Sequence, residues 1–463
     1  MVGLVLDGRE SGPGARAYAE DVARWLARDG IQTHLLVLVP TPSSPRVLHS
    51  ICRGDSWLQR DEAHPGGEAI RAALQTNDSP DVVAALAAEV SHLIQREGVG
   101  VLHAIGSPLA ADVAHAIHER ARTPYLVTPR GDEWTRADEA FQTLARRALG
   151  EARHVLVADE DAGRALAARF EPRPGEPHPH PRALQRGVDL ELFQPLARGE
   201  RRRVADALAT RPALGARLEG VDWEHACVVL CVEPRAGRYG FEQFLFAMPE
   251  LVRQQPALQV VVATTGRDHG RTDQLRAALA SGRSETLHDV LQTSELYQPL
   301  LDHLACIHSE NRAESWWAAA ARLEPERRLC YTGPVERREF AQLLRLADLV
   351  VMPGTAPRPA SQIPYEALAC GVLSLASESA GLGPIVRLLT SEVSAEIAAL
   401  CVLRPGAQPV REMEEKAGRI LRLRPELAGR LRALAEKQFD GRQAAAVLRR
   451  LYGEPARVAA LRS

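Results

Sequence analysis

The feature that most constrains this chain is a repeated alternation of short apolar segments with amphipathic segments of helical period. The apolar segments are continuous rather than alternating, which is typical of strands buried on both faces. In the first part of the chain such strands are predicted at 2–7, 33–39, 99–105, 124–129 and 154–159. The segments between them have helical spacing, as in Tyr18, Val22, Trp25 and Leu26 before the C-capping Gly30. This alternation predicts a parallel sheet with helices on both faces.

The same alternation begins again after the charged stretch 198–203, with strands predicted at 225–233, 258–264, 327–333, 348–353 and 371–377. We therefore predict an α/β chain with two tandem doubly wound parallel-sheet domains. The first is expected over 1–197, joined by a returning C-terminal helix at 441–463, and the second over 215–440. Its weakly patterned region 268–326 is interpreted as an insertion or lid. Ligands of such sheets bind outside the carboxyl ends of the strands, so the site is expected in a cleft between the domains.

Composition excludes several classes of protein. Lys+Arg (57) and Asp+Glu (59) are nearly balanced and aromatic residues make up 5% of the 463 residues, which argues against a nucleic-acid partner. The 7 cysteines are scattered in apolar runs, as reduced core thiols are in cytoplasmic proteins. No apolar run reaches the roughly 18 residues of a spanning helix. We expect a soluble protein without a signal peptide, in the cytoplasm or peripheral at the inner face of the membrane.

Seven short segments, taken in order, resemble one known family. They are SGPGAR (11–16), VLHAIGSPLA (101–110), VTPRGDEW (127–134), LQRGVDLELFQP (184–195), VEPRAGRYGFEQFL (232–245), YTGPV (331–335) and RPASQIPYEALACG (358–371). Their order resembles the retaining glycosyltransferases of family 4, which have the two-domain GT-B architecture. The resemblance implies transfer of a sugar, with retention, from a UDP- or GDP-sugar to a glycan, a lipid-linked acceptor or a small molecule, as in polysaccharide biosynthesis.

Two positions in the last segment carry the implied donor chemistry. The family has two glutamates with seven residues between them, and the second falls on Glu366. The resemblance implies that Glu366 accepts hydrogen bonds from the donor ribose; alternatively it only stabilises the start of its helix. The first glutamate is replaced by Arg358, which offers donors alone and would suit an anionic sugar or an additional phosphate.

Arginines are also expected at the donor diphosphate. The family's arginine and lysine at this place align with Pro234 and Tyr239, but Arg235 and Arg238 each lie one residue away. We predict that these two guanidinium groups bind the diphosphate and stabilise it as it leaves. The alternative is that they are solvated loop charges.

Further residues complete the two predicted sides of the site. Ser361, Gly381 and Gly383 are assigned to the donor side, where Pro384 replaces the family's usual glutamate. The acceptor or sugar loop is assigned to Gly12, Gly14, His103, Arg130 and Asp132. For Arg130 and Asp132 the alternative is a structural ion pair. His103, predicted at the end of its strand, is a candidate general base for the acceptor hydroxyl, and the alternative is a core histidine with satisfied hydrogen bonds. No metal or other cofactor is required by this chemistry, in which the nucleotide-sugar is a substrate.

The departures at Pro234, Tyr239, Arg358 and Pro384 all fall around the expected donor pocket. They leave two hypotheses of different class. One is an active glycosyltransferase, which we favour. The other is an inactive pseudo-glycosyltransferase that serves as a binding or scaffolding subunit for a protein partner.

Overall fold

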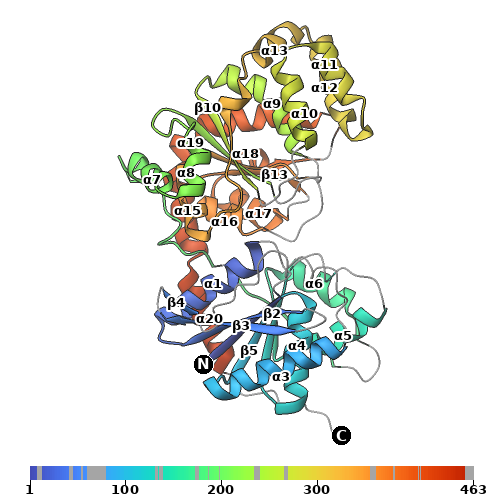
Figure 1. Ribbon diagram of the computed structural model, residues 1–463, viewed down its shortest axis with the longest axis vertical. Coiled ribbons are helices and arrows are strands. Elements are labelled where there is room, and N and C mark those ends of the chain that lie inside the picture. The colour runs from blue at the N-terminus through green and yellow to red at the C-terminus, as the bar shows by residue number, and fades with distance from the viewer. Residues whose placement is uncertain are drawn as a thin grey trace. The chain divides into compact units, whose positions relative to one another are not determined.

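The structure is a computed structural model, and it describes residues 1–7, 13–40, 45–53, 56–59, 80–130, 134, 139–172, 177–185, 187–197, 199–233, 240–264, 270–354, 361–378, 381–404, 406 and 408–453 (Figure 1). The chain forms two compact units. The first combines Met1–Gly187 with Phe439–Ser463, and the second is Val188–Gln438. The first unit thus ends before residue 197, because backbone carbonyls of 190–194 bond to arginines of the second unit.

The first unit contains an eight-stranded sheet in the order β4-β3-β2-β1-β5-β6-β7-β8. Its strands are β1 (Val2–Asp7), β2 (Thr33–Val39), β3 (Arg46–Arg53), β4 (Ser56–Gln59), β5 (Val101–Gly106), β6 (Tyr125–Pro129), β7 (His154–Val157) and β8 (Pro181–Ala183). Its helices are α1 (Pro13–Arg28), α3 (Pro80–Glu97), α4 (Pro108–Ala121), α5 (Glu139–Gly150), α6 (Glu160–Arg169) and α20 (Gly441–Gly453). The strand order reverses between β1 and β5.

Two strands at one edge depart from the expected parallel arrangement. β3 pairs antiparallel with β2, and β4 pairs antiparallel with β3. In β3 the residues Val47, His49 and Ile51 are buried, whereas Leu48 and Ser50 between them are partly exposed. This period of two is typical of an antiparallel strand covered on one face, which a search for continuous apolar runs does not detect.

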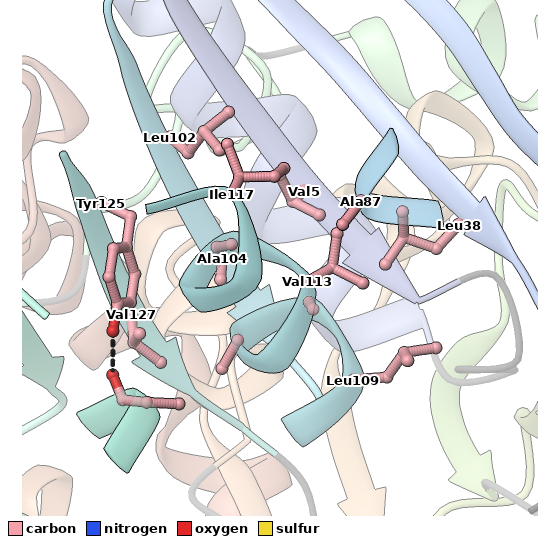
Figure 2. Packing of buried hydrophobic residues seen from close by; sticks show 14 of the residues in the cluster. Val5, Leu38, Ala87, Leu102, Ala104, Leu109, Val113, Ile117, Tyr125 and Val127 are labelled. Carbon is pink, nitrogen blue, oxygen red and sulfur yellow. Dashed lines mark hydrogen bonds between the residues drawn. The ribbon is translucent and has the colours of Figure 1, made fainter. Parts of the chain in front are cut away.

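The core of the first unit explains why α4 forms where it does. Leu109, Val113 and Ile117 follow one another at four-residue intervals and are fully buried. Figure 2 shows Ile117 near Leu102 and Val5, and all three helix residues belong to the same buried cluster as these strand residues. Ser107 caps the helix by accepting a hydrogen bond from the Ala110 amide at 3.4 Å. The four-residue spacing of these apolar side chains therefore explains which face of α4 packs against the sheet.

The second unit contains a six-stranded parallel sheet in the order β11-β10-β9-β12-β13-β14. Its strands are β9 (Cys227–Glu233), β10 (Leu258–Thr264), β11 (Leu329–Tyr331), β12 (Leu349–Met352), β13 (Ser374–Ser377) and β14 (Val402–Leu403). Its helices outside the β10–β11 crossover are α7 (Glu200–Ala209), α8 (Pro212–Leu218), α9 (Phe241–Gln254), α15 (Arg337–Leu346), α16 (Ile363–Ala369), α17 (Gly383–Glu392), α18 (Ala395–Leu400) and α19 (Pro409–Gln438). The two doubly wound sheets confirm the predicted fold class.

The crossover from β10 to β11 contains the region interpreted as an insertion. It forms α10 (Gly270–Ala280), α11 (Ser284–Leu291), the 3-10 helix η2 (Glu295–Tyr297), α12 (Gln298–Ser309), α13 (Ala313–Ala320) and α14 (Pro325–Arg328). Polar side chains connect it to α19: the buried His303 Nε2 lies 3.4 Å from Oε1 of the buried Glu414, and the partly exposed Arg312 donates to Glu414 Oε2 at 3.1 Å. Within the second unit, α11–α13 lie at the opposite end from α16 and α17 (Figure 1).

Among the described residues, no helix combines the length and the apolar character needed to cross a bilayer.

Candidate functional site

The strand order of the second sheet locates the candidate site. Connections run from β9 toward β10 on one side, whereas β12 lies on the other side of β9. At such a reversal the loops after two neighbouring strands separate, and their carboxyl ends leave room for a ligand. The loop after β9 contains Arg235 and Arg238, and the segment after β12 contains Arg358, Ser361 and Glu366. Gly381 and Gly383 follow β13.

The end of the loop after β9 lies against the start of the loop after β12. Gly240, at the end of the loop after β9, has φ 148°, and a Cβ there would collide with the Pro353 carbonyl directly after β12. A side chain at residue 240 would therefore separate the two loops or strain the backbone. The close approach of the two segments at the start of α9 therefore favours glycine at residue 240.

Several predicted site residues lie outside the described residues. They are Arg235, Arg238, Arg358, Gly12 and Asp132, together with the departures Pro234 and Tyr239. Their flanking positions are described: Glu233 ends β9, Gly240 precedes α9, and Gly354 and Ser361 bracket the loop that contains Arg358. Their assigned roles remain predictions.

Glu366 lies in the first turn of α16, the helix after β12, whose second residue is Pro364. Its side chain is fully buried and accepts a hydrogen bond from Arg337 Nη2 at 2.7 Å. Arg337 is the first residue of α15, and its guanidinium carbon lies 4.5 Å from the centroid of the Phe193 ring. Neither expected role of Glu366 included this ion pair. No local signal in the sequence pairs two residues that are 29 positions apart.

Arg432 is a second arginine that sequence analysis did not single out. From α19 it donates to the carbonyls of Phe193 at 2.7 Å, Ala369 at 3.1 Å and Leu190 at 3.2 Å. Ala369 is the last residue of α16. Arg432 therefore fixes the C-terminal end of the helix that carries Glu366.

The other donor-side residues have local structural roles in the described chain. Ser361 Oγ accepts a hydrogen bond from the Ile363 amide at 3.3 Å, at the start of α16. Gly381 has φ 68°, which favours glycine, and Gly383 is the first residue of α17. These contacts order the starts of two helices beside β12 and β13. They leave the predicted contact with a donor as a prediction.

In the first unit the strand order reverses between β1 and β5, and a small polar cluster lies at their carboxyl ends. Ser107 Oγ donates to Asp7 Oδ2 at 3.1 Å. The Gly106 carbonyl accepts from the Arg130 amide at 3.0 Å and from Trp134 Nε1 at 2.5 Å. Together these bonds order the strand ends near which the acceptor substrate of the sugar was expected to bind.

Two residues of the predicted acceptor loop border this cluster. The Arg130 guanidinium lies 4.2 Å from the centroid of the Tyr18 ring in α1. Gly14 lies in the first turn of α1. Both therefore flank the carboxyl end of β1, and their contact with an acceptor remains a prediction.

His103 occupies a different position from the one assigned to it. It is the third residue of β5, fully buried, and not at the strand end. Its Nδ1 lies 2.7 Å from the Tyr452 hydroxyl and its Nε2 lies 2.7 Å from Thr128 Oγ1. Burial lowers the pKa of His103 to about 3. Both ring nitrogens are engaged inside the core, so this geometry matches the core histidine and leaves no nitrogen for a general base.

Comparison with known proteins agrees with this architecture. Residues 13–183 match the family described as Glycosyl transferase 4-like domain. None of the curated proteins matches the sequence.

Solved structures resemble the chain along nearly its whole length. Sucrose-phosphate synthase from Thermosynechococcus elongatus is 17% identical with a TM-score of 0.59, over 98% of each chain. HepE from Anabaena, in complex with UDP and glucose, is 14% identical with a TM-score of 0.55, over 97% of this chain and 99% of HepE.

The catalytic domain of starch synthase IV from Arabidopsis thaliana, bound to ADP and acarbose, is 9% identical with a TM-score of 0.56, over 97% of this chain and 98% of that domain. At these identities the likeness establishes the fold. Residues 13–183 thus match a glycosyl transferase 4-like domain, and the chain as a whole shares the fold of these solved structures, which agrees with the predicted GT-B architecture.

Proposed function

We propose that the protein is a retaining glycosyltransferase that binds a nucleotide-sugar at the carboxyl ends of β9 and β12. The observation that carries this proposal is the contact of Gly240 with Pro353, which joins the two loops at the strand-order reversal. One loop contains Arg235 and Arg238, and the other contains Arg358. The end of the first loop therefore lies beside the start of the second, so both loops can contact one ligand.

The chemistry at such a site needs positive charge and hydrogen-bond donors rather than a metal. As the bond from the sugar to the diphosphate breaks, negative charge grows on the leaving diphosphate. Arg235 and Arg238 would pair with these oxygens, and arginine can do so through two parallel hydrogen bonds. Glu366 would accept hydrogen bonds from the ribose hydroxyls. The acceptor, a glycan, lipid-linked or small molecule, would bind the first unit near Arg130 and Gly14.

Nucleotide binding tests the proposal directly. UDP-glucose, GDP-mannose and ADP-glucose are titrated into the full chain by calorimetry, with melting temperature as a second readout. We expect one of them to bind, and Arg238→Ala to weaken that binding by about 1.5–3 kcal/mol, as expected for hydrogen bonds to a charged group.

Arg202→Ala is the matched control, because the Arg202 side chain is 77% exposed in α7 and lies 4.0 Å from the exposed Glu224 carboxylate. Equal affinity in the Arg238 variant and the wild type would contradict the assignment of the diphosphate site.

One observation favours the alternative of an inactive relative. Glu366 is fully buried and already hydrogen-bonded to Arg337, as a purely structural ion pair would be. A chain that binds none of these nucleotide-sugars in calorimetry would support the pseudo-glycosyltransferase, and a protein partner would then be its ligand.

A further inference from the structure

Arg337 lies between Glu366 and the linker segment, defined here as residues 188–194, with which the second unit begins. It donates to Glu366 Oε1 at 2.7 Å and stacks on Phe193 at 4.5 Å. Glu366 and Phe193 are fully buried, and the Arg337 side chain is 12% exposed. A carboxylate and an aromatic face both stabilise a cation, so one guanidinium holds both neighbours.

The linker segment and α16 share further donors. Arg432 bonds to the carbonyls of Leu190 and Phe193 and also to Ala369 at the end of α16. Arg337 and Arg432 therefore connect the first turn and the last residue of α16 to the same segment. Because buried polar groups keep their partners, a shift of the linker segment has to move Glu366 or break these bonds.

We propose that Arg337 is a positioning residue for Glu366: it sets the direction in which the carboxylate meets the donor ribose and couples that contact to the linker segment. This proposal rests on the proposed function and deepens it, because it names the group that orients the ribose acceptor. A hydrogen bond to Oε1 restricts rotation of the carboxylate about its last bond. The guanidinium also pairs with the charge of the carboxylate, whose two oxygens can both accept hydrogen bonds.

A purely structural ion pair makes a different prediction. Removing one partner of a buried pair destabilises a protein whether or not a ligand binds there. Such a loss lowers the melting temperature but changes the affinity for all nucleotides in the same proportion. The ratio of affinities for a nucleotide with and without its ribose hydroxyls is therefore the informative quantity.

The first experiment measures this ratio. UDP, GDP and ADP are each compared with their 2′,3′-dideoxy forms by calorimetry on the full chain. For the nucleotide that binds, we expect a preference of about tenfold or more for the ribose form in the wild type, as lost hydrogen bonds to a charged group imply. Arg337→Ala should bring the ratio close to one, and Arg337→Lys should restore part of it. An unchanged ratio in Arg337→Ala would overturn the proposal.

Arg345→Ala is the matched control. Arg345 lies in the same helix α15 and also bonds to the linker segment, through the Gln194 carbonyl at 3.2 Å, but its carboxylate partner is Glu200 rather than Glu366. This variant should keep the ratio of the wild type. Loss of the ratio in Arg345→Ala as well would show that any disturbance of the linker segment suffices, and would overturn the specific role of Arg337.

The second experiment needs no nucleotide. The Phe193 amide donates to the Asp189 carbonyl at 2.8 Å, so its hydrogen exchange reports on the linker segment. We expect Glu366→Gln and Arg337→Ala each to accelerate this exchange several-fold, although Glu366 does not belong to the segment. If the wild type binds no nucleotide, the proposed function fails while this experiment still tests the coupling. Unchanged exchange in both variants would overturn it.

Discussion

At the scale of single residues, His103 shows how burial sets chemistry. Its folded pKa of about 3 lies below the ordinary value of 6.5, so the unfolded chain binds a proton between these values and the folded chain does not. The contribution of His103 to stability is therefore complete above about pH 6.5 and falls by about 1.4 kcal/mol per pH unit as the pH drops toward 3.

We expect His103→Gln to be less stable than the wild type by about 1–3 kcal/mol near neutral pH, because two core hydrogen bonds are disturbed. The difference should shrink on acidification, because Gln does not titrate. Melting curves at about pH 7.5 and about pH 5 measure both effects. The exposed His178 in the same unit provides the control variant His178→Gln. A stability difference that stays constant with pH would contradict the assignment.

At the scale of elements, the junction of β9 with α9 depends on Gly240. Gly240→Ala places a Cβ against the Pro353 carbonyl at a backbone conformation that L-residues rarely adopt. We expect a loss of about 2–4 kcal/mol from strain and overpacking together, visible as a lower melting temperature and faster exchange in the first turn of α9.

Gly199→Ala separates these causes. Gly199 has φ 82°, but no atom lies within 4 Å of an added Cβ, so only backbone strain should appear. We expect a loss of about 1 kcal/mol there. Equal losses in both variants would mean that the contact between the two loops contributes nothing.

At the scale of the whole molecule, the chain leaves the first unit at Gly187 and returns to it at Phe439. The returning α20 buries Ala445, Leu448 and Leu451 in the first core. Close packing at the return requires glycine: a Cβ at Gly187 would lie 2.7 Å from Trp25, and Gly441 contacts the same indole.

Deleting residues 439–463 should therefore destabilise the first unit by several kcal/mol, given about 1.5–3 kcal/mol for each buried leucine, and leave the second unit folded. Hydrogen exchange resolved along the chain measures this: protection in α1 should fall while protection in β9 and β10 persists. Loss of protection in the second unit to the same extent would show that the two units do not fold separately.

Much of the fold follows from the sequence because its signals are local. The predicted bounds of β1, β2 and β10 agree with the structure residue for residue. Continuous apolar runs define buried parallel strands, and glycine or proline ends them. The β3–β4 hairpin was missed because its period-two pattern includes polar residues such as His49, which stacks on His34 inside the unit.

The candidate site was less predictable. Resemblance pointed to Glu366, and its position in the first turns of α16 agrees with the expected strand–loop–helix order. Its partner Arg337 could not be found in this way, because their contact joins the starts of two helices that only the packed sheet brings together. For His103 the residue type suggested catalysis, whereas its surroundings make it a core residue.

By itself the sequence determined the period of each element, the number of times the alternation repeats and the places where glycine or proline ends a segment, because neighbouring residues fix backbone preference and side-chain direction. Only the tertiary structure decided which strands are neighbours, which loops meet and which charges are paired. The physical reason is that the hydrogen bonds of Arg337 and Arg432 join residues far apart in the sequence. Such residues come within bonding distance only when the elements pack, so no local pattern encodes their contact.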